Sequence, residues 1–473
     1  MIENMMELDK LKEECGVIGI YAPGLKNISQ LAYFGLHALQ HRGQESAGIA
    51  ANDGGRIQYY KEAGLVQEVF TDEIIRRLQG DIAIGHVRYS TTGDACVVNA
   101  QPLVVQHKGG GIALAHNGNL INAPEIREQL QDQGAIFQTS IDSEVIANLV
   151  ARYSTTLSAE EAIRKTMEQI QGSYAVVLTL GQKLIGVRDP YGLKPLCIGK
   201  FEGGYVISSE SCAFHVLDAE FVRDVAPGEI VVIEDNEIHS MMGIKGEKKA
   251  FCSFEFVYFA RPDSVLDGQS VYISRKNAGK ILAQEHPVEA DMVIAVPDSG
   301  TVAAIGYSEE SKIPFGEGLI KNRYVGRTFI QPTQKMRELS VRLKLNVLKE
   351  NIKGKRLVLV DDSIVRGTTS RKIVDLLKSA GAKEVHVRIS SPPVKYSCYF
   401  GIDTPARKNL VGATRSVEEI RKMIGADSLG YLSIEGLFRS IQMPGDILCG
   451  ACFSGNYPME VPRESSQYVF EKR

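Results

Sequence analysis

No apolar stretch in the 473-residue chain approaches the roughly 18 residues that a membrane-spanning helix needs. An excess of charge of one sign is also lacking, because 54 basic and 57 acidic side chains leave a formal net charge of -3. Composition therefore gives no reason to expect binding to nucleic acid or to a membrane surface. Internal repeats and low-complexity tracts are not evident either. A soluble globular protein is expected.

The amino terminus lacks a secretory signal, since the first fourteen residues, MIENMMELDKLKEE, carry five acids and no apolar centre. A cytoplasmic location is the expected default. Cysteine is sparse, and a chain of this length is unlike the small secreted domains that disulfides hold together. Reduced thiols are expected, some with a chemical role. The eight cysteines are Cys15, Cys96, Cys197, Cys212, Cys252, Cys398, Cys449 and Cys452.

Two domains are expected, because one hydrophobic core rarely organises 473 residues. From Cys15 to about Ile238, short runs of β-branched and aromatic residues predict strands. The helix candidates in this part of the chain are residues 28–40, 143–153 and 158–170, the last of which opens with a serine cap and early acids. We therefore expect a layered α+β domain here.

From about Met292 the pattern changes to continuous apolar strands that are each followed by a helix. The runs DMVIAVPDSG, RLVLVDDSIVRGTTSRKIVDLLKSAGA and KEVHVRISSPP predict an α/β domain with a parallel sheet covered on both faces. The charged stretch MMGIKGEKKAF lies between the two patterns. Residues 15–245 and residues 246–473, the latter with a C-terminal tail, are therefore the two expected domains.

Four motifs follow Cys15 in the first domain: HRGQESAGI at 41–49, GHVRYST at 85–91, HNGNLIN at 116–122 and IDSE at 141–144. A cysteine by itself is usually a small core residue, and an Asn-Gly pair by itself usually marks a hairpin turn. In this order, however, the motifs resemble the glutaminase domain of the N-terminal-nucleophile amidotransferases. The resemblance extends from Cys15 to about residue 240 and implies an αββα fold.

The resemblance implies a nucleophile and an oxyanion site. The Cys15 thiol would attack the side-chain amide of glutamine, and its own α-amino group, with an unperturbed pKa of roughly 7.7 to 8.0, would serve as the base. This arrangement requires that residues 1–14 be removed as a propeptide. The Asn117 side chain and the Gly118 backbone N–H would stabilise the negative charge that develops on the amide oxygen.

Three further residues would bind glutamine in such a site. Arg88 would pair with the α-carboxylate and Asp142 with the α-amino group, while Gly43 would allow the backbone to approach the substrate closely. His86 and His116 lie beside apolar residues and are equally well explained as core histidines, so neither is assigned a catalytic role.

The most specific run in the second domain is LVLVDDSIVRGTTS, at 357–370. A buried strand ends at Asp361 and Asp362, and Gly367 precedes a helix that begins with two threonines. Amides and hydroxyls at a helix start suit a phosphate, and carboxylates at the strand end suit ribose hydroxyls and a magnesium-bound pyrophosphate. A vicinal acid pair is usually a solvated turn, but this combination resembles the signature of type I phosphoribosyltransferases.

A second loop, VPDSG at 296–300, resembles the pyrophosphate loop of the same family. Under this resemblance magnesium would be held by Ser299, Asp361 and Asp362. The residues that would bind phosphoribosyl pyrophosphate are Asp298, Ser299, Gly300, Asp361, Asp362, Ser363, Arg366, Gly367, Thr368 and Thr369.

Residues 321–344, between the two loops, carry seven basic residues and one acid. Such a charge run is commonly a solvated face, and a nucleic-acid contact is the other plain reading. The resemblance implies instead a mobile loop that covers the pyrophosphate, with Arg323, Arg327 and Lys335 as its basic residues.

Four cysteines fit neither site: Cys252, Cys398, and the pair Cys449 and Cys452. A CxxC pair with two distant partners is compatible with zinc, an iron-sulfur cluster or redox chemistry, and spacing does not choose between them. The propeptide-bearing subgroup of glutamine phosphoribosylpyrophosphate amidotransferases carries a 4Fe-4S cluster on cysteines in matching contexts, so the resemblance implies that cluster. The remaining cysteines, Cys96, Cys197 and Cys212, are expected to be small core residues.

Together the two domains resemble the glutamine phosphoribosylpyrophosphate amidotransferases. The resemblance implies release of ammonia from glutamine and its transfer to phosphoribosyl pyrophosphate, which yields 5-phosphoribosylamine, glutamate and pyrophosphate in the committed step of purine synthesis. It also implies inhibition by purine nucleotides and a homotetramer. Enzymes of hexosamine or asparagine synthesis share the glutaminase motifs but have no use for the phosphoribosyl signature. A non-catalytic sensor of phosphoribosyl pyrophosphate is the alternative of another class, and the intact set at Cys15, Arg88, Asn117 and Asp142 argues against it.

Overall fold

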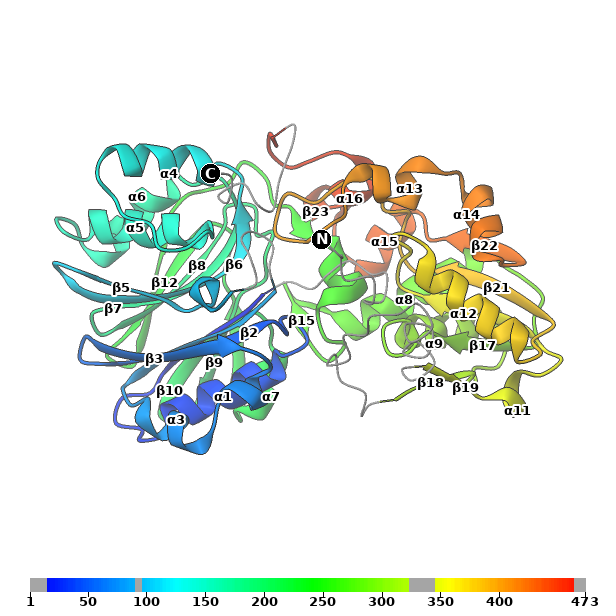
Figure 1. The fold of residues 1–473 in the computed structure, drawn as a ribbon, viewed down its shortest axis with the longest axis horizontal. Helices are drawn as coiled ribbons and strands as arrows, with labels where there is room; N and C mark the ends of the chain where they lie inside the picture. The colour runs from blue at the N-terminus through cyan, green and yellow to red at the C-terminus, as the bar shows by residue number, and fades with distance from the viewer. Residues whose placement is uncertain (1–14, 90–95, 323–344, 463–473) are drawn as a thin grey trace.

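The computed structural model describes residues 15–89, 96–322 and 345–462, which form two lobes (Figure 1). The first lobe stacks two antiparallel sheets between two layers of helices. The second lobe is built on a parallel sheet with helices on both faces. The prediction of an αββα domain followed by a domain with a parallel sheet is confirmed.

The first lobe contains a seven-stranded sheet and a six-stranded sheet. In spatial order, the first sheet is β11 (Glu220–Asp224), β9 (Cys197–Phe201), β10 (Gly204–Ser208), β1 (Gly16–Tyr21), β4 (Ile82–Arg88), β2 (Ser46–Asp53) and β3 (Arg56–Ala63). The second is β13 (Glu237–Met242), β12 (Glu229–Glu234), β8 (Lys183–Arg188), β7 (Gly172–Leu180), β6 (Gly110–Leu120) and β5 (Leu103–His107).

Helices cover the outer face of each sheet. The first sheet packs on α1 (Ile28–Ala38), α2 (Val66–Val69), α3 (Asp72–Arg77) and α7 (Cys212–Val216). The second packs on α4 (Ala123–Asp132), α5 (Ser143–Tyr153) and α6 (Ala159–Met167), while the short helix η1 (Val97–Asn99) precedes β5. The three predicted helices are confirmed within two or three residues, and Ser158 caps α6 by accepting the Glu161 N–H.

Strand β1 shows why this lobe needs unbroken apolar runs. Successive side chains of a strand point to opposite faces, so Val17 packs into the core between the sheets while Ile18 and Ile20 pack under the outer helices. All six residues of GVIGIY are therefore buried. This places the segment that follows Cys15 in the middle of the layered structure.

The second lobe is built on four parallel strands in the order β17 (Met292–Ala295), β20 (Arg356–Asp361), β21 (Glu384–Ile389) and β22 (Ser428–Tyr431). Alternate side chains of these strands enter two separate cores. One core contains α8 (Val271–Glu285), α9 (Thr301–Ser311) and α15 (Ile434–Ile441), and the other contains α12 (Thr368–Ser379) and α14 (Val417–Ile424).

Short elements complete the second lobe. They are the strand pairs β14 (Phe251–Cys252) with β23 (Leu448–Cys449), β15 (Val265–Leu266) with β16 (Gln269–Ser270) and β18 (Leu319–Lys321) with β19 (Leu345–Val347), and the helices η2 (Glu255–Phe259, a π-helix), α11 (Lys349–Ile352), η3 (Arg407–Asn409), α13 (Val411–Thr414), η4 (Gly445–Ile447) and α16 (Ala451–Ser454). Among the helices of the described residues, none combines the length and the apolar character that a membrane span requires.

Candidate active sites

Cys15 directly precedes β1, a central strand of the first sheet. Gly16 pairs with Val87 of β4, so the cysteine lies beside Arg88 at the end of the neighbouring strand. The thiol donates a hydrogen bond to the Tyr89 carbonyl oxygen at 3.3 Å. Burial raises the pKa of the Cys15 thiol to about 11. A nucleophile in this environment is protonated at neutral pH and needs a base close at hand.

The Asn-Gly pair of the third motif lies in β6 rather than in a turn. Gly118 has a φ of 150°, and a Cβ there would stand 2.1 Å from the Ser173 carbonyl oxygen, so only glycine fits. The side chain of Asn117 is buried, and its amide nitrogen has no hydrogen-bond partner among the described residues. A buried amide donor without a partner is costly, unless a ligand that the amide can bind completes the site.

Arg88 and Asp142 are both buried, at 3% and 4% exposure, close to the same motifs. Asp142 precedes α5 and accepts a hydrogen bond from the Leu120 N–H at 2.8 Å, which ties it to the strand that carries Asn117 and Gly118. The positive charge of Arg88 opposes the rise in the Cys15 pKa, and the negative charge of Asp142 opposes the fall in the His116 pKa. The structure thus brings these predicted site residues together.

Gly43 packs on a neighbouring strand so closely that no side chain fits there, which the sequence did not indicate. A Cβ at this position would lie 2.5 Å from the Val87 carbonyl carbon and 2.6 Å from the Arg88 nitrogen. The loop of the first motif therefore packs directly on the backbone of β4 at the end that carries Arg88. Two residues of the second motif, Ser90 and Thr91, lie outside the described residues.

The two histidines of the motifs have structural surroundings. Burial lowers the pKa of His86 to about 3, and its Nε2 lies 3.2 Å from the His116 carbonyl oxygen. The His116 Nδ1 lies 2.9 Å from the Ser143 hydroxyl. Both rings are uncharged at neutral pH and join β4, β6 and α5.

The two phosphoribosyl motifs meet at one edge of the second-lobe sheet. The VPDSG loop follows β17 and the DDSIVRG loop follows β20, and these strands are adjacent and parallel. A Cβ on Gly300 would lie 2.4 Å from the Val360 carbonyl oxygen, so the loops are in close contact. Asp298 is exposed and pairs with the Lys321 ammonium at 3.0 Å. This is the edge at which open α/β sheets bind ligands.

The acid pair and the helix start differ in exposure. Asp361 and Asp362 are buried, and the Asp362 carboxylate accepts the Ser363 hydroxyl at 2.6 Å. Gly367 has a φ of 82° and stands immediately before α12, whose first residue is Thr368. Arg366 and Thr368 are exposed beside this helix start. Of the basic loop, Arg323, Arg327 and Lys335 lie outside the described residues.

Cys252, Cys398, Cys449 and Cys452 gather around the β14–β23 pair of the second lobe. Of the other three cysteines, Cys197 and Cys212 are buried as expected, but Cys96 is exposed, so its prediction as a core residue was wrong. Cys252 of β14 is the register partner of Cys449 of β23. Burial raises the pKa of the Cys449 thiol to about 12, and the neighbouring Cys398 adds to the shift. Cys449 and Cys398 act in the same direction on Cys452. Within the described ranges no group of three or more thiol, imidazole or carboxylate side chains is placed as a single metal ion requires.

Three buried groups close to Cys15 were missed from the sequence. Arg42 of the first motif donates to the Cys15 carbonyl oxygen at 3.1 Å and forms ion pairs with Glu210 and Glu255. Glu255 belongs to the second lobe and is an acid within the aromatic run FCSFEFVYF. A charge inside an apolar run is the signal that could have found it.

Comparison with known proteins covers both lobes. A family model described as a glutamine amidotransferase domain matches residues 86–216, and one described as a phosphoribosyl transferase domain matches residues 263–391. The amidophosphoribosyltransferase of Archaeoglobus fulgidus is 53% identical over 459 residues, which cover 96% of this chain and 100% of that protein. The amidophosphoribosyltransferase of Bacillus subtilis is 49% identical, with 98% and 97% of the two chains covered.

Solved structures agree with the sequence relatives. The glutamine phosphoribosylpyrophosphate amidotransferase of B. subtilis, complexed with ADP and GMP, is similar with a TM-score of 0.90 at 48% identity, over 96% of this chain and 99% of its own. A structure described as the allosteric regulatory enzyme of purine biosynthesis has a TM-score of 0.91 at 48% identity, over 97% and 99% of the two chains. Because about half of the residues are shared over almost the whole length with curated relatives of one activity, the chain belongs to the amidophosphoribosyltransferase family and is an enzyme that uses glutamine to aminate phosphoribosyl pyrophosphate.

Proposed function

We propose that Cys15 is the glutaminase nucleophile and that Asn117 and Gly118 form its oxyanion hole. The observation that carries this proposal is the buried side-chain amide of Asn117, whose nitrogen lacks a hydrogen-bond partner among the described residues. The next residue, Gly118, has a backbone conformation that only glycine can adopt. The thiol would attack the glutamine amide carbon, ammonia would leave, and water would hydrolyse the thioester to glutamate. Arg88 and Asp142 would hold the α-carboxylate and the α-amino group, with Gly43 keeping the first motif against β4.

The base in this proposal is the α-amino group of Cys15, so residues 1–14 would be a propeptide. The supporting observation is the raised pKa of the buried thiol, which makes a nearby proton acceptor necessary. Residues 1–14 lie outside the described residues. Mass spectrometry of the active enzyme should give a chain that begins at Cys15.

The second site would bind phosphoribosyl pyrophosphate between the two loops at the edge of the β17–β20 sheet. Amides and hydroxyls of 363–369 would hold the 5'-phosphate at the start of α12, and Asp298, Ser299 and Gly300 would contact the pyrophosphate. The carboxylates of Asp361 and Asp362 fit magnesium, which prefers oxygen ligands and retains several from water and substrate; Ser299 is the third proposed ligand. When bound, magnesium would neutralise charge on the leaving pyrophosphate.

Cys252, Cys398, Cys449 and Cys452 are proposed to hold a 4Fe-4S cluster with a structural role. Their convergence on the β14–β23 pair supports a shared group. A single tetrahedral zinc ion holds its sulfurs only about 3.8 Å apart, whereas a cubane, with one thiolate for each iron, accepts a wider set. A cluster at this place would link β14, near the start of the second lobe, to β23 and α16, near the end of the described residues.

Regulation and assembly are also proposed from the relatives. The B. subtilis structure is complexed with ADP and GMP, which supports inhibition of this enzyme by purine nucleotides. A homotetramer in the cytoplasm, acting in purine synthesis, completes the proposal.

Two variants test the division of labour between the sites. Cys15→Ala should abolish synthesis from glutamine and leave synthesis from ammonium intact, because the second site is separate. Asp361→Asn should impair both reactions by on the order of 10²-fold, since both nitrogen sources share the phosphoribosyl site. Pyrophosphate release measures each reaction. Glutamine-dependent synthesis that survives in Cys15→Ala would refute the nucleophile.

A further inference from the structure

A buried ionic group lies where the two lobes meet. Its centre is Arg42, which is 1% exposed. The Arg42 Nε donates to the Cys15 carbonyl oxygen at 3.1 Å. Its two terminal nitrogens donate to Glu210 at 2.5 Å and to the two oxygens of Glu255 at 3.1 and 2.7 Å. The backbone of the proposed nucleophile is thus connected through one side chain to a carboxylate of the other lobe.

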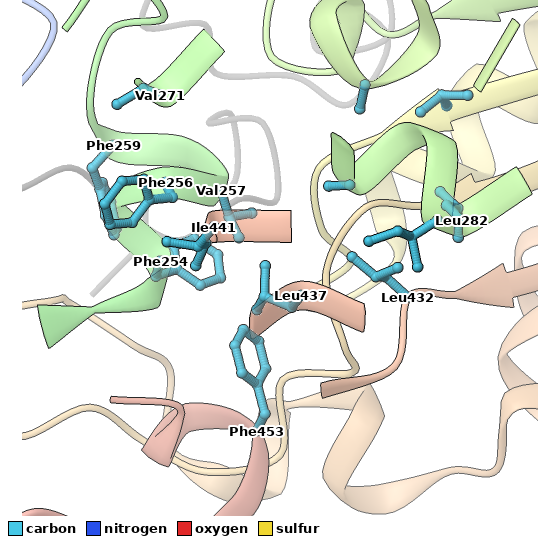
Figure 2. Close-up of a cluster of buried hydrophobic side chains, with 14 of the residues drawn as sticks. Phe254, Phe256, Val257, Phe259, Val271, Leu282, Leu432, Leu437, Ile441 and Phe453 are labelled. Carbon is cyan, nitrogen blue, oxygen red and sulfur yellow. The ribbon is translucent and has the colours of Figure 1, made fainter. Parts of the chain in front are cut away.

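The position of Glu255 is determined by the second lobe. Glu255 opens the π-helix η2. The carbonyl oxygens of Phe256 in this helix and of Ala260 directly after it accept hydrogen bonds from the buried Arg275 of α8 at 2.8 and 2.7 Å. Four neighbours of Glu255 are buried in one core (Figure 2), where Phe254, Phe256, Val257 and Phe259 pack with Leu437, Ile441 and Phe453. The backbone that carries Glu255 therefore cannot shift toward or away from Arg42 without disturbing that core.

Both carboxylates are needed to keep Arg42 buried. An arginine remains charged at all physiological pH values, and a buried charge must be paired. Glu210 also accepts the Arg261 N–H at 2.9 Å and the Ser264 hydroxyl at 2.6 Å from the second lobe. Burial alone would raise the Glu210 pKa, but the interactions with His41 and Arg42 outweigh it and hold the pKa well below its usual range. Glu210 thus shares its carboxylate among several donors, and Glu255 supplies the bidentate partner of the Arg42 guanidinium.

We propose that Glu255 is a positioning residue for the glutaminase reaction, which holds Arg42 against the Cys15 carbonyl and so determines where the nucleophile stands. This inference rests on the proposed role of Cys15. The carbonyl and the thiol belong to the same residue, so loss of the bidentate pair with Arg42 displaces the sulfur relative to Asn117 and Gly118. A displacement of about 1 Å at a reacting group can cost on the order of 10²-fold in rate. The glutaminase site is then complete only when the second lobe contributes this carboxylate.

The chain offers a matched control for the test. Arg188, a buried residue of the first lobe, forms a second bidentate pair across the same junction, donating to the two oxygens of the partly buried Asp267 at 2.7 and 2.9 Å. Asp267 belongs to the second lobe and has a φ of 48°, which asparagine tolerates. In the described contacts this pair makes no hydrogen bond to Cys15. Asp267→Asn therefore removes the same kind of interaction without touching the nucleophile.

Glu255→Gln should lower kcat for glutamine hydrolysis by roughly 10- to 10²-fold. The KM for glutamine should stay unchanged, because Arg88 and Asp142 hold the substrate, and synthesis from ammonium should be retained. Alkylation of the Cys15 thiol by iodoacetamide should slow in parallel, since it reports on the same sulfur. In Asp267→Asn all of these quantities should match the unaltered enzyme.

Each alternative outcome decides a different question. An unchanged kcat in Glu255→Gln, while Cys15→Ala is inactive with glutamine, would overturn the positioning role and leave the nucleophile standing. Equal losses in Glu255→Gln and Asp267→Asn would show that lobe docking in general, not this contact, is responsible, and would also overturn it. If Glu255→Gln does not fold, Glu255→Asp keeps the charge but shortens its reach. A lower kcat at unchanged KM in that variant supports the role, and an unchanged kcat refutes it.

Discussion

At the scale of single residues, Asp224 of β11 is a carboxylate held in an unfavourable environment. Burial, together with the negative charge of Asp267, raises the Asp224 pKa from 3.8 to about 6, against the opposing charge of Arg188. Between about pH 4 and pH 6 the unfolded chain has released this proton while the folded chain still holds it. The folded state therefore loses stability as pH rises through this window and does not regain it above pH 6.

Asp224→Asn should remove that loss. At pH about 7.5 the variant should be more stable than the unaltered enzyme by roughly 1 kcal/mol, because water screens this partly exposed site, and at pH about 4.5 the two should be similar. Thermal melts at both pH values measure the difference. Asp235→Asn, at an exposed hairpin turn, controls for the loss of one negative charge. A gain of the same size at both pH values would contradict this account.

At the scale of elements, β20, its loop and α12 form the unit that would hold the sugar phosphate. Gly367 stands at a φ of 82° before α12, and a Cβ there would lie 2.3 Å from the Met423 methyl group of α14. Gly367→Ala should strain the loop by about 1–2 kcal/mol and weaken the helix start as a phosphate site. A rise of roughly tenfold in the KM for phosphoribosyl pyrophosphate is expected.

The control for this change is Gly354→Ala. Gly354 has a similar φ of 77°, in the turn after α11, and apart from its chain neighbours no atom of the described residues lies within 4 Å of the position that its Cβ would take. It carries the same backbone strain at a distance from the proposed site. A KM that rises equally in both variants would show that the effect comes from general loosening rather than from the α12 helix start.

Local patterns explain which elements were predictable. The apolar run of β20, the Gly-Thr-Thr turn and the helix that follows are contiguous, so sequence alone placed them, and the serine cap of α6 likewise lies within its own segment. The π-helix η2 was not predicted, because its conformation depends on a core built from residues 437, 441 and 453, far along the chain. The close packing of Gly43 on β4 was missed for the same reason.

At the scale of the whole molecule, two of the described second-lobe segments that touch the proposed glutaminase site each begin at one of the four gathered cysteines. Cys252 precedes Glu255 by three residues. Cys398 precedes a loop whose Tyr399 and Phe400 carbonyl oxygens accept hydrogen bonds from Asn119 at 2.9 Å and from Ser173 at 2.7 Å. A Cβ on Gly401 would lie 3.0 Å from the Gly118 carbonyl carbon, so this loop lies directly on the proposed oxyanion strand.

A cluster on these cysteines would therefore hold both segments in place. Anaerobically purified enzyme should be brown and contain about four irons per chain, and Cys449→Ser should lose the iron while Cys96→Ser, at an exposed site, should keep it. On exposure to oxygen, glutamine-dependent synthesis should fall before ammonium-dependent synthesis, because the glutaminase site depends on both segments. Iron content, visible absorbance and the two activities are followed in the same samples. Fully active, colourless enzyme that contains one zinc, or no metal, would refute the cluster.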